Sequence, residues 1–171
     1  MSSDLRPLLL GRSTAPDRDL YLARLDDVQH WPETIDEPKP HFVVFLAMDA
    51  SAVEANRLAT FSRKLIAQGM VYLCVWGPDC ERVHDVFDAE SIERGETDED
   101  FLMTTSHDDE ELDDALWFAL FSTLPSEDYI ETCGALIAVV VDDAEWGEHV
   151  ETSLADVNRF NDEVLAREPD A

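Results

Sequence analysis

Residues 41–48 read HFVVFLAM, and Asp49 follows them directly. A continuous apolar run of this length that ends in an acid is typical of a strand buried on both faces. Val71–Trp76 (VYLCVW) and Ala135–Val141 (ALIAVVV) have the same character, and Phe101–Thr105 fits a third, less apolar strand between them. The chain therefore contains four predicted strands after residue 40.

Helical patterns alternate with these strands. Ser51–Glu54 fits a capping box that opens a helix, and Gly69 stands where the residue after a helix is expected. Ser106–Asp109 fits a second cap followed by acids, which suit the positive end of a helix dipole. The predicted helices cover approximately residues 51–68, 80–94, 108–124 and 146–164.

This alternation predicts an α/β fold. We expect a three-layer sandwich whose mainly parallel, four-stranded sheet carries helices on both faces. Its order would be Rossmann-like or flavodoxin-like, with 2-1-3-4 and 3-2-1-4 both open. Residues 41–168 would form this single domain. Residues 1–40 contain five of the eight prolines and predict an irregular arm packed on it, although Leu20–Leu22 also suits an edge strand.

Net charge is the dominant property of the composition. The 171 residues include 39 acids and 12 bases, which gives −27 at pH 7, and 45% are apolar, which is enough for a core. Such a surface repels nucleic acid phosphates and anionic lipid, so neither direct nucleic acid binding nor membrane binding is expected. Basic proteins and divalent cations are favoured, although acidity can also reflect salt adaptation.

Several classes of protein are disfavoured by the motifs that the sequence lacks. We expect neither a transmembrane helix nor a secretory signal, because no apolar run is long enough. An odd number of cysteines, three, argues against a disulfide framework and indicates a reducing cytoplasm. The glycine-rich phosphate loops and the G-x-S-x-G motif are absent, so the common nucleotide enzymes and hydrolases are not indicated.

Acidic side chains follow the predicted strands, at the edge where α/β sheets bind ligands. Asp49, Asp79, His107 and Asp142 could together hold Mg²⁺ or Mn²⁺ and support a hydrolase or phosphotransferase. No other cofactor is expected. The alternative is structural, because aspartate and serine are the usual caps where a strand gives way to a helix.

Cys80 is the candidate nucleophile. It lies in the first turn of a predicted helix, where the dipole lowers a thiol pKa, and His84 follows one turn later. His107 could complete a zinc site with these two residues. Against catalysis, the acids Asp79, Glu81 and Asp85 surround the thiol with negative charge, and the spacing of Cys80 suits a small core residue.

The negative charge is concentrated between residues 79 and 114. This region holds sixteen acids and two arginines, so it carries −14 of the −27. A single-sign field of this size attracts a basic protein. The acids expected to contact such a partner are Glu90, Glu93, Glu96, Asp98, Glu99, Asp100, Asp108 and Asp109.

The predicted helix 108–124 carries surplus apolar surface. Trp117 to Phe121 are consecutive apolar residues and therefore encircle the helix. The sheet can cover only one side, so Trp117 and Phe121 must meet the N-terminal arm or another chain. A partner interface or a homodimer through this helix is accordingly expected as one alternative.

Taken together, these features favour a non-enzymatic acidic interaction module that binds a basic protein, as an accessory, immunity-type or nucleic-acid-mimicking inhibitor does. The divalent-metal enzyme is the alternative.

Overall fold

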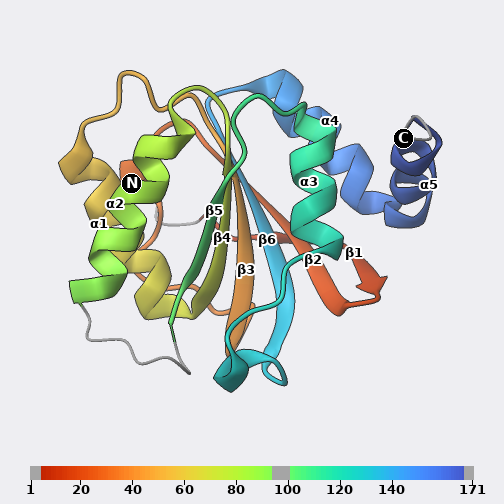
Figure 1. Ribbon diagram of the computed structural model, residues 1–171, viewed down its shortest axis with the longest axis horizontal. Helices are drawn as coiled ribbons and strands as arrows, with labels where there is room; N and C mark the ends of the chain where they lie inside the picture. Colours follow the sequence, from red (N-terminus) through yellow and green to blue (C-terminus); the bar gives the residue numbers. More distant parts are fainter. Residues whose placement is uncertain (1–4, 94–100, 168–171) are drawn as a thin grey trace.

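The computed structural model describes residues 5–93 and 101–167 and is built around one mixed, mostly parallel sheet (Figure 1). The strand order is β1-β2-β6-β3-β4-β5. All neighbours pair in parallel except β1 and β2, which are antiparallel. The strands are β1 (Leu8–Thr14), β2 (Asp17–Leu25), β3 (His41–Ala47), β4 (Met70–Trp76), β5 (Met103–Ser106) and β6 (Cys133–Val141).

The prediction of a four-stranded sheet and an irregular N-terminal arm is wrong. Residues 8–25 form a hairpin whose second strand pairs with β6, so β2 lies inside the sheet. The prolines do not prevent this, because Pro7 precedes β1, Pro16 lies in the hairpin turn and the remaining three follow β2. Among the later strands the order β5-β4-β3-β6 corresponds to 3-2-1-4, one of the two expected orders.

Helices cover both faces of the sheet (Figure 1). On one face, α1 and α2 bury residues such as Phe61 and Phe87 against the sheet. On the other face, α3, α4 and α5 contribute residues such as Leu116, Leu154 and Phe160 to a second core cluster. The helices are α1 (Ala55–Gln68), α2 (Cys80–Glu93), α3 (Leu112–Phe121), α4 (Ala144–Ala155) and α5 (Val157–Arg167), and the short 3₁₀ helices are η1 (Val28–His30) and η2 (Glu127–Tyr129).

Two of the predicted helix starts are wrong. The helix after β3 begins at Ala55 with no side-chain cap, since the Ser51 hydroxyl and amide donate to the Asp49 carboxylate instead. The helix after β5 begins only at Leu112, because the preceding residues form a turn. Gly69 is confirmed as the helix-ending residue: its φ is 116°, and its amide donates to the carbonyl groups at the end of α1.

The predicted terminal helix is divided into two. Asp156 separates α4 from α5 with a φ of −142°, outside the helical region. After this break α5 packs beside α3, and the Trp117 indole donates to Asn161 Oδ1 at 2.7 Å. The surplus apolar side of α3 is therefore partly covered by the chain's own C-terminal helix, and Trp117 and Phe121 are half-buried. A homodimer or partner interface through this helix stays a prediction.

None of the helices in residues 5–93 and 101–167 combines the length and the hydropathy that a bilayer span requires.

Candidate functional site

An acidic residue follows every parallel strand at the edge of the sheet where those strands end. Asp26 follows β2, Asp49 follows β3, Asp79 follows β4, Asp108 follows β5 and Asp142 follows β6. Because parallel strands end at the same edge, these turns lie along one side of the sheet. We call this set the acidic rim, and it comprises Asp26, Asp27, Asp49, Asp79, Asp108, Asp109, Asp142 and Asp143.

The rim contains a hollow of about 440 Å³ between the turns that follow β2, β3 and β6. These three strands are neighbours in the sheet, in the order β2-β6-β3, which explains why their turns meet. Apolar groups complete the wall, among them Val53, Pro78 and the side chain of Trp146. The aspartates that line the hollow are Asp26, Asp27, Asp49, Asp142 and Asp143.

Backbone conformation accounts for part of this pattern. Asp79, Asp109 and Asp142 have φ values of 66°, 62° and 53°. Aspartate is one of the few non-glycine residues that tolerate the left-handed region. Each of the three therefore has a structural role in turning the chain away from its strand, whatever its charge contributes.

Other rim carboxylates accept hydrogen bonds from the local backbone. Asp27 accepts from the Gln29 amide at 2.9 Å, and Asp143 caps α4 by accepting from the Trp146 amide at 3.0 Å. Hydrogen bonds from the hydroxyl and amide of Ser51 hold the pKa of Asp49 below its ordinary value. Asp49 is exposed and therefore carries a full negative charge at neutral pH.

Two arginines neutralise only part of the rim. Arg57 lies 3.4 Å from a carboxylate oxygen of Asp27, and Arg82 lies 2.8 Å from Asp79. Arg82 is also held by the carbonyl oxygens of Ala50 and Val53, so it braces the turn after β3. Within the part of the chain that the structure describes, no ion pair is formed by Asp49, Asp108, Asp109, Asp142 or Asp143.

The four predicted metal ligands are not brought together. Asp79 is paired with Arg82, and His107 is buried below the rim. Both His107 ring nitrogens are engaged, with Nδ1 3.0 Å from Glu110 Oε2 and Nε2 2.9 Å from Thr105 Oγ1. Across residues 5–93 and 101–167, no three His, Cys, Asp or Glu side chains are placed to hold a metal ion. The hollow contains Asp49 and Asp142 but neither Asp79 nor His107.

Cys80 and His84 do not form a nucleophile and base. Cys80 is buried at the start of α2, and burial raises the pKa of its thiol. His84 instead lies with Nε2 3.1 Å from Thr104 Oγ1 and Nδ1 3.2 Å from Asp85. The predicted zinc set, which adds His107 to these two, is likewise absent from the described residues.

The predicted partner-binding acids fall into three groups. Glu90 is paired with Arg63 at 3.0 Å, so its charge is already compensated. Glu93, Asp108 and Asp109 are exposed. The acids outside the described residues are Glu96, Asp98, Glu99 and Asp100. Trp117 and Phe121, which were expected to face a partner or the N-terminal arm, are half-buried and pack against the core cluster to which α5 contributes.

Sequence reasoning missed Asp26 and Asp27 as site residues, because it predicts an irregular arm where the structure has β2. The sequence does contain a signal for this strand end, because two aspartates follow Leu25 just as two aspartates follow Val141. Trp146 packs against the core cluster and also lines the hollow, a double position that the apolar period along residues 146–164 does not indicate.

The family comparison covers this edge of the sheet. Residues 20–157 match the model of a domain of unknown function, DUF7684. The chain belongs to the DUF7684 family. The DUF7684 region includes all the rim aspartates. It also includes the five parallel strands, except for the first residues of β2, and β1 lies before the region. No curated protein and no solved structure gives a significant match.

Proposed function

We propose that this protein is a non-enzymatic interaction module that binds a basic protein partner at the acidic rim. The observation that supports the proposal is the row of rim carboxylates that form no ion pair among the described residues, along a single edge of the sheet: Asp49, Asp108, Asp109 and Asp142. These residues lie within three positions of a strand end, in short turns that fix their backbone. Their charges are therefore placed along the edge before a partner arrives. Such an arrangement favours fast, charge-steered association.

The hollow indicates which group of the partner would enter. Its wall combines five carboxylates with the partly exposed ring of Trp146. The Trp76 ring packs against Trp146 at 4.9 Å between centroids and 74° between planes, so the indole is held rigidly. A lysine ammonium or arginine guanidinium gains from both the carboxylates and an aromatic ring, whereas an anion is repelled.

The proposed partner is therefore a protein with clustered lysine or arginine. An accessory, immunity-type or nucleic-acid-mimicking role each fits this chemistry. The three cysteines are all free and buried, which suits a reducing compartment such as the cytoplasm.

The test uses a fluorescein-labelled peptide of alternating lysine and arginine, followed by fluorescence anisotropy. The rim variant is Asp49→Asn with Asp109→Asn and Asp142→Asn, because asparagine keeps the turn geometry and removes the charge. The control changes Glu127→Gln, Asp128→Asn and Glu131→Gln, which are exposed acids beside the start of β6 at the opposite edge. Both variants lose the same charge.

We expect the rim variant to bind the peptide about tenfold more weakly and the control about as well as the natural chain. Equal weakening in the two variants would show that the peptide responds to the total charge alone. In that case the acidity reflects solvation or salt adaptation, and the rim is a set of turn residues.

A further inference from the structure

Strand β1 forms an open edge of the sheet. It pairs only with β2, on one side, and no other strand within the described residues lies beside its second side (Figure 1). The backbone amides and carbonyls along such a side are a template for a further strand. Proteins usually protect an edge of this kind with charged side chains, proline or a bulge.

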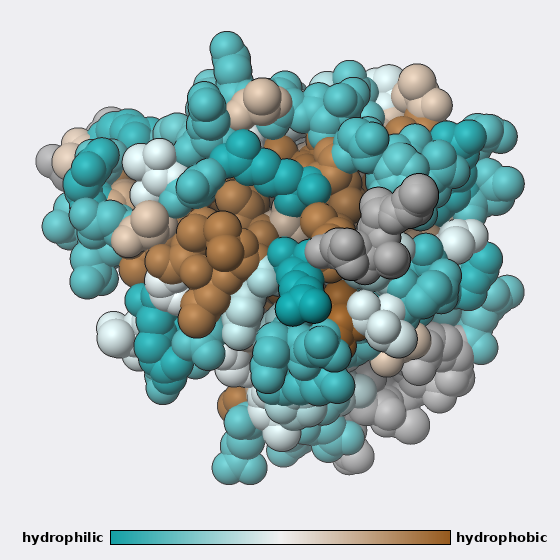
Figure 2. All heavy atoms as spheres, turned by 180° about the vertical axis from the view of Figure 1, so that it is seen from behind, coloured by the Kyte–Doolittle hydropathy of each residue, from teal (hydrophilic) through white to brown (hydrophobic). Residues whose placement is uncertain are grey.

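The protection of this edge is incomplete. Residues 5–14 read LRPLLLGRST and contain two arginines and no acid, in a chain with 39 acids. Leu8 is 57% exposed and Leu9 is 54% exposed, although the pairing with β2 is interrupted by a bulge between Leu9 and Gly11. Figure 2 shows that apolar side chains gather in one broad area on the face seen from behind.

The strand is held firmly in place. A side chain at Gly11 would lie 2.4 Å from the carbonyl oxygen of Leu154, so β1 packs directly on the backbone of α4. Arg12 is 2.6 Å from a carboxylate oxygen of Asp17, across the hairpin. An edge fixed in this way can accept a new strand without first losing conformational freedom.

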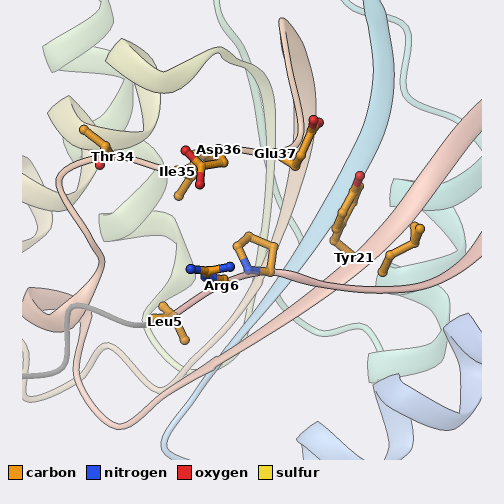
Figure 3. A pocket seen from close by; sticks show the side chains of 9 residues that line it. Leu5, Arg6, Tyr21, Thr34, Ile35, Asp36 and Glu37 are labelled. Atoms are coloured by element: carbon orange, nitrogen blue, oxygen red, sulfur yellow. The ribbon is translucent and has the colours of Figure 1, made fainter.

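A groove of about 450 Å³ runs beside the first residues of the hairpin (Figure 3). Its walls are the segment that contains Leu5 and Leu9 and the loop with Asp36 and Glu37, and Tyr21 lies between them. Figure 3 shows that Arg6, Asp36 and Glu37 come from these two facing segments. None of the three takes part in an ion pair within the described part of the chain.

We propose that β1 pairs in an antiparallel manner with β1 of a second copy of this chain, with the two-fold axis close to Leu9, so that the two sheets become one continuous sheet. Under a two-fold axis, this surface of one copy contacts the same surface of the other copy. The surface suits self-association because it offers exposed leucines together with one arginine and two carboxylates that lack partners. Because residues 5–14 contain no acid, two chains of net charge −27 can bring their β1 strands together without placing acids of these segments opposite one another.

This assembly has a salt dependence opposite to that of the acidic rim. Two copies of net charge −27 repel one another at long range, and added salt screens that repulsion. Dimerisation therefore strengthens with salt, whereas binding of a basic peptide at the rim weakens. The two proposals can for this reason fail independently of one another.

The first experiment is sedimentation analysis of the full chain at low and high NaCl, about 0.05 and 1 M. We expect a monomer–dimer equilibrium whose dissociation constant falls with salt. Leu9→Lys should raise that constant at least about tenfold, and Leu165→Lys, at a leucine 52% exposed on α5, should leave it unchanged. A monomer under all conditions overturns the proposal, and so does a dimer that tolerates Leu9→Lys.

The second experiment locates the contact by disulfide formation. Since all three natural cysteines are buried, Leu9→Cys and Leu165→Cys each introduce a single exposed thiol. Mild oxidation should cross-link the Leu9→Cys chain at least about tenfold faster than the Leu165→Cys chain. Equal rates would mean that the thiols meet by random collision. A dimer that is not cross-linked through Leu9 would likewise contradict pairing through β1, and an extended strand of another protein would then be the better occupant of this edge.

Discussion

Gly77 offers the sharpest test of how the acidic rim is built. It follows β4 with a φ of 121°, and its amide and carbonyl belong to the turn that leads to Asp79. A side-chain carbon at this position would lie 2.0 Å from the Met48 carbonyl oxygen and 2.9 Å from the Met48 carbonyl carbon. Both are backbone atoms directly after β3, so the clash cannot be relieved by the movement of a flexible side chain.

The expected cost of Gly77→Ala has two parts. A non-glycine residue at such a φ costs about 1–3 kcal/mol, and displacing packed neighbours costs about 1–3 kcal/mol more. The sum is about 4 kcal/mol of unfolding free energy, which for a chain of this length lowers the melting temperature by about 8–16 °C. Urea unfolding followed by circular dichroism gives the free energy directly.

Gly134→Ala is the matched control. Gly134 lies in β6 with no atom within 4 Å of the added carbon, and its φ is not positive. We expect a change within about 0.5 kcal/mol, in the stabilising direction. If Gly77→Ala were as stable as Gly134→Ala, the ends of β3 and β4 could not approach one another as described, and the geometry of the rim would be wrong.

Three further outcomes follow from individual residues. Asp142 has a φ of 53°, so Asp142→Ala should lose about 1 kcal/mol while Asp142→Gly loses nothing, and equal losses in urea unfolding would contradict its role as a turn residue. Burial alone would raise the pKa of Asp113, but hydrogen bonds from His149 and Arg167 outweigh it and hold the pKa below its ordinary value. That stabilisation is present above pH about 4 and is lost as the pH falls through the lowered pKa. Asp113→Asn should therefore cost about 2 kcal/mol at pH 7 and progressively less as the pH falls below about 4; a pH-independent cost in the unfolding curves would refute this. Burial raises the pKa of all three thiols, that of Cys74 to about 12. A thiol reagent at pH 8 should therefore label none of the cysteines before the chain unfolds. Rapid labelling of Cys80 in the native chain would restore this residue as a candidate nucleophile.

The fold was predictable where one local pattern decides it. Residues 42–47 and 135–141 are uniformly apolar because strands in the middle of a parallel sheet are buried on both faces. Strand β2 was missed because it carries charged residues, and Arg18 among them is buried. Its guanidinium donates to the Thr123 hydroxyl at 2.7 Å and carbonyl at 3.0 Å, more than one hundred residues away. No local pattern reveals such a partner.

The candidate site was predictable only in outline. The sequence shows that acids follow strands, but which acids become neighbours depends on strand order. Because β6 lies between β2 and β3, the turns with Asp142 and Asp49 meet that with Asp26, and Asp79 stands outside the hollow. The cover of Trp117 by α5 likewise depends on the helix break at Asp156, which the apolar period along residues 146–164 does not indicate.

The most direct test of binding at the rim is an amide chemical-shift map of the ¹⁵N-labelled chain titrated with the lysine–arginine peptide. Binding at the rim predicts that the largest shifts fall in the turns after the parallel strands, together with the indole of Trp146, and that they diminish as NaCl is raised. The edge that carries Glu127, Asp128 and Glu131 should shift little. Shifts spread evenly over exposed acids, or centred on that opposite edge, would contradict the proposed function.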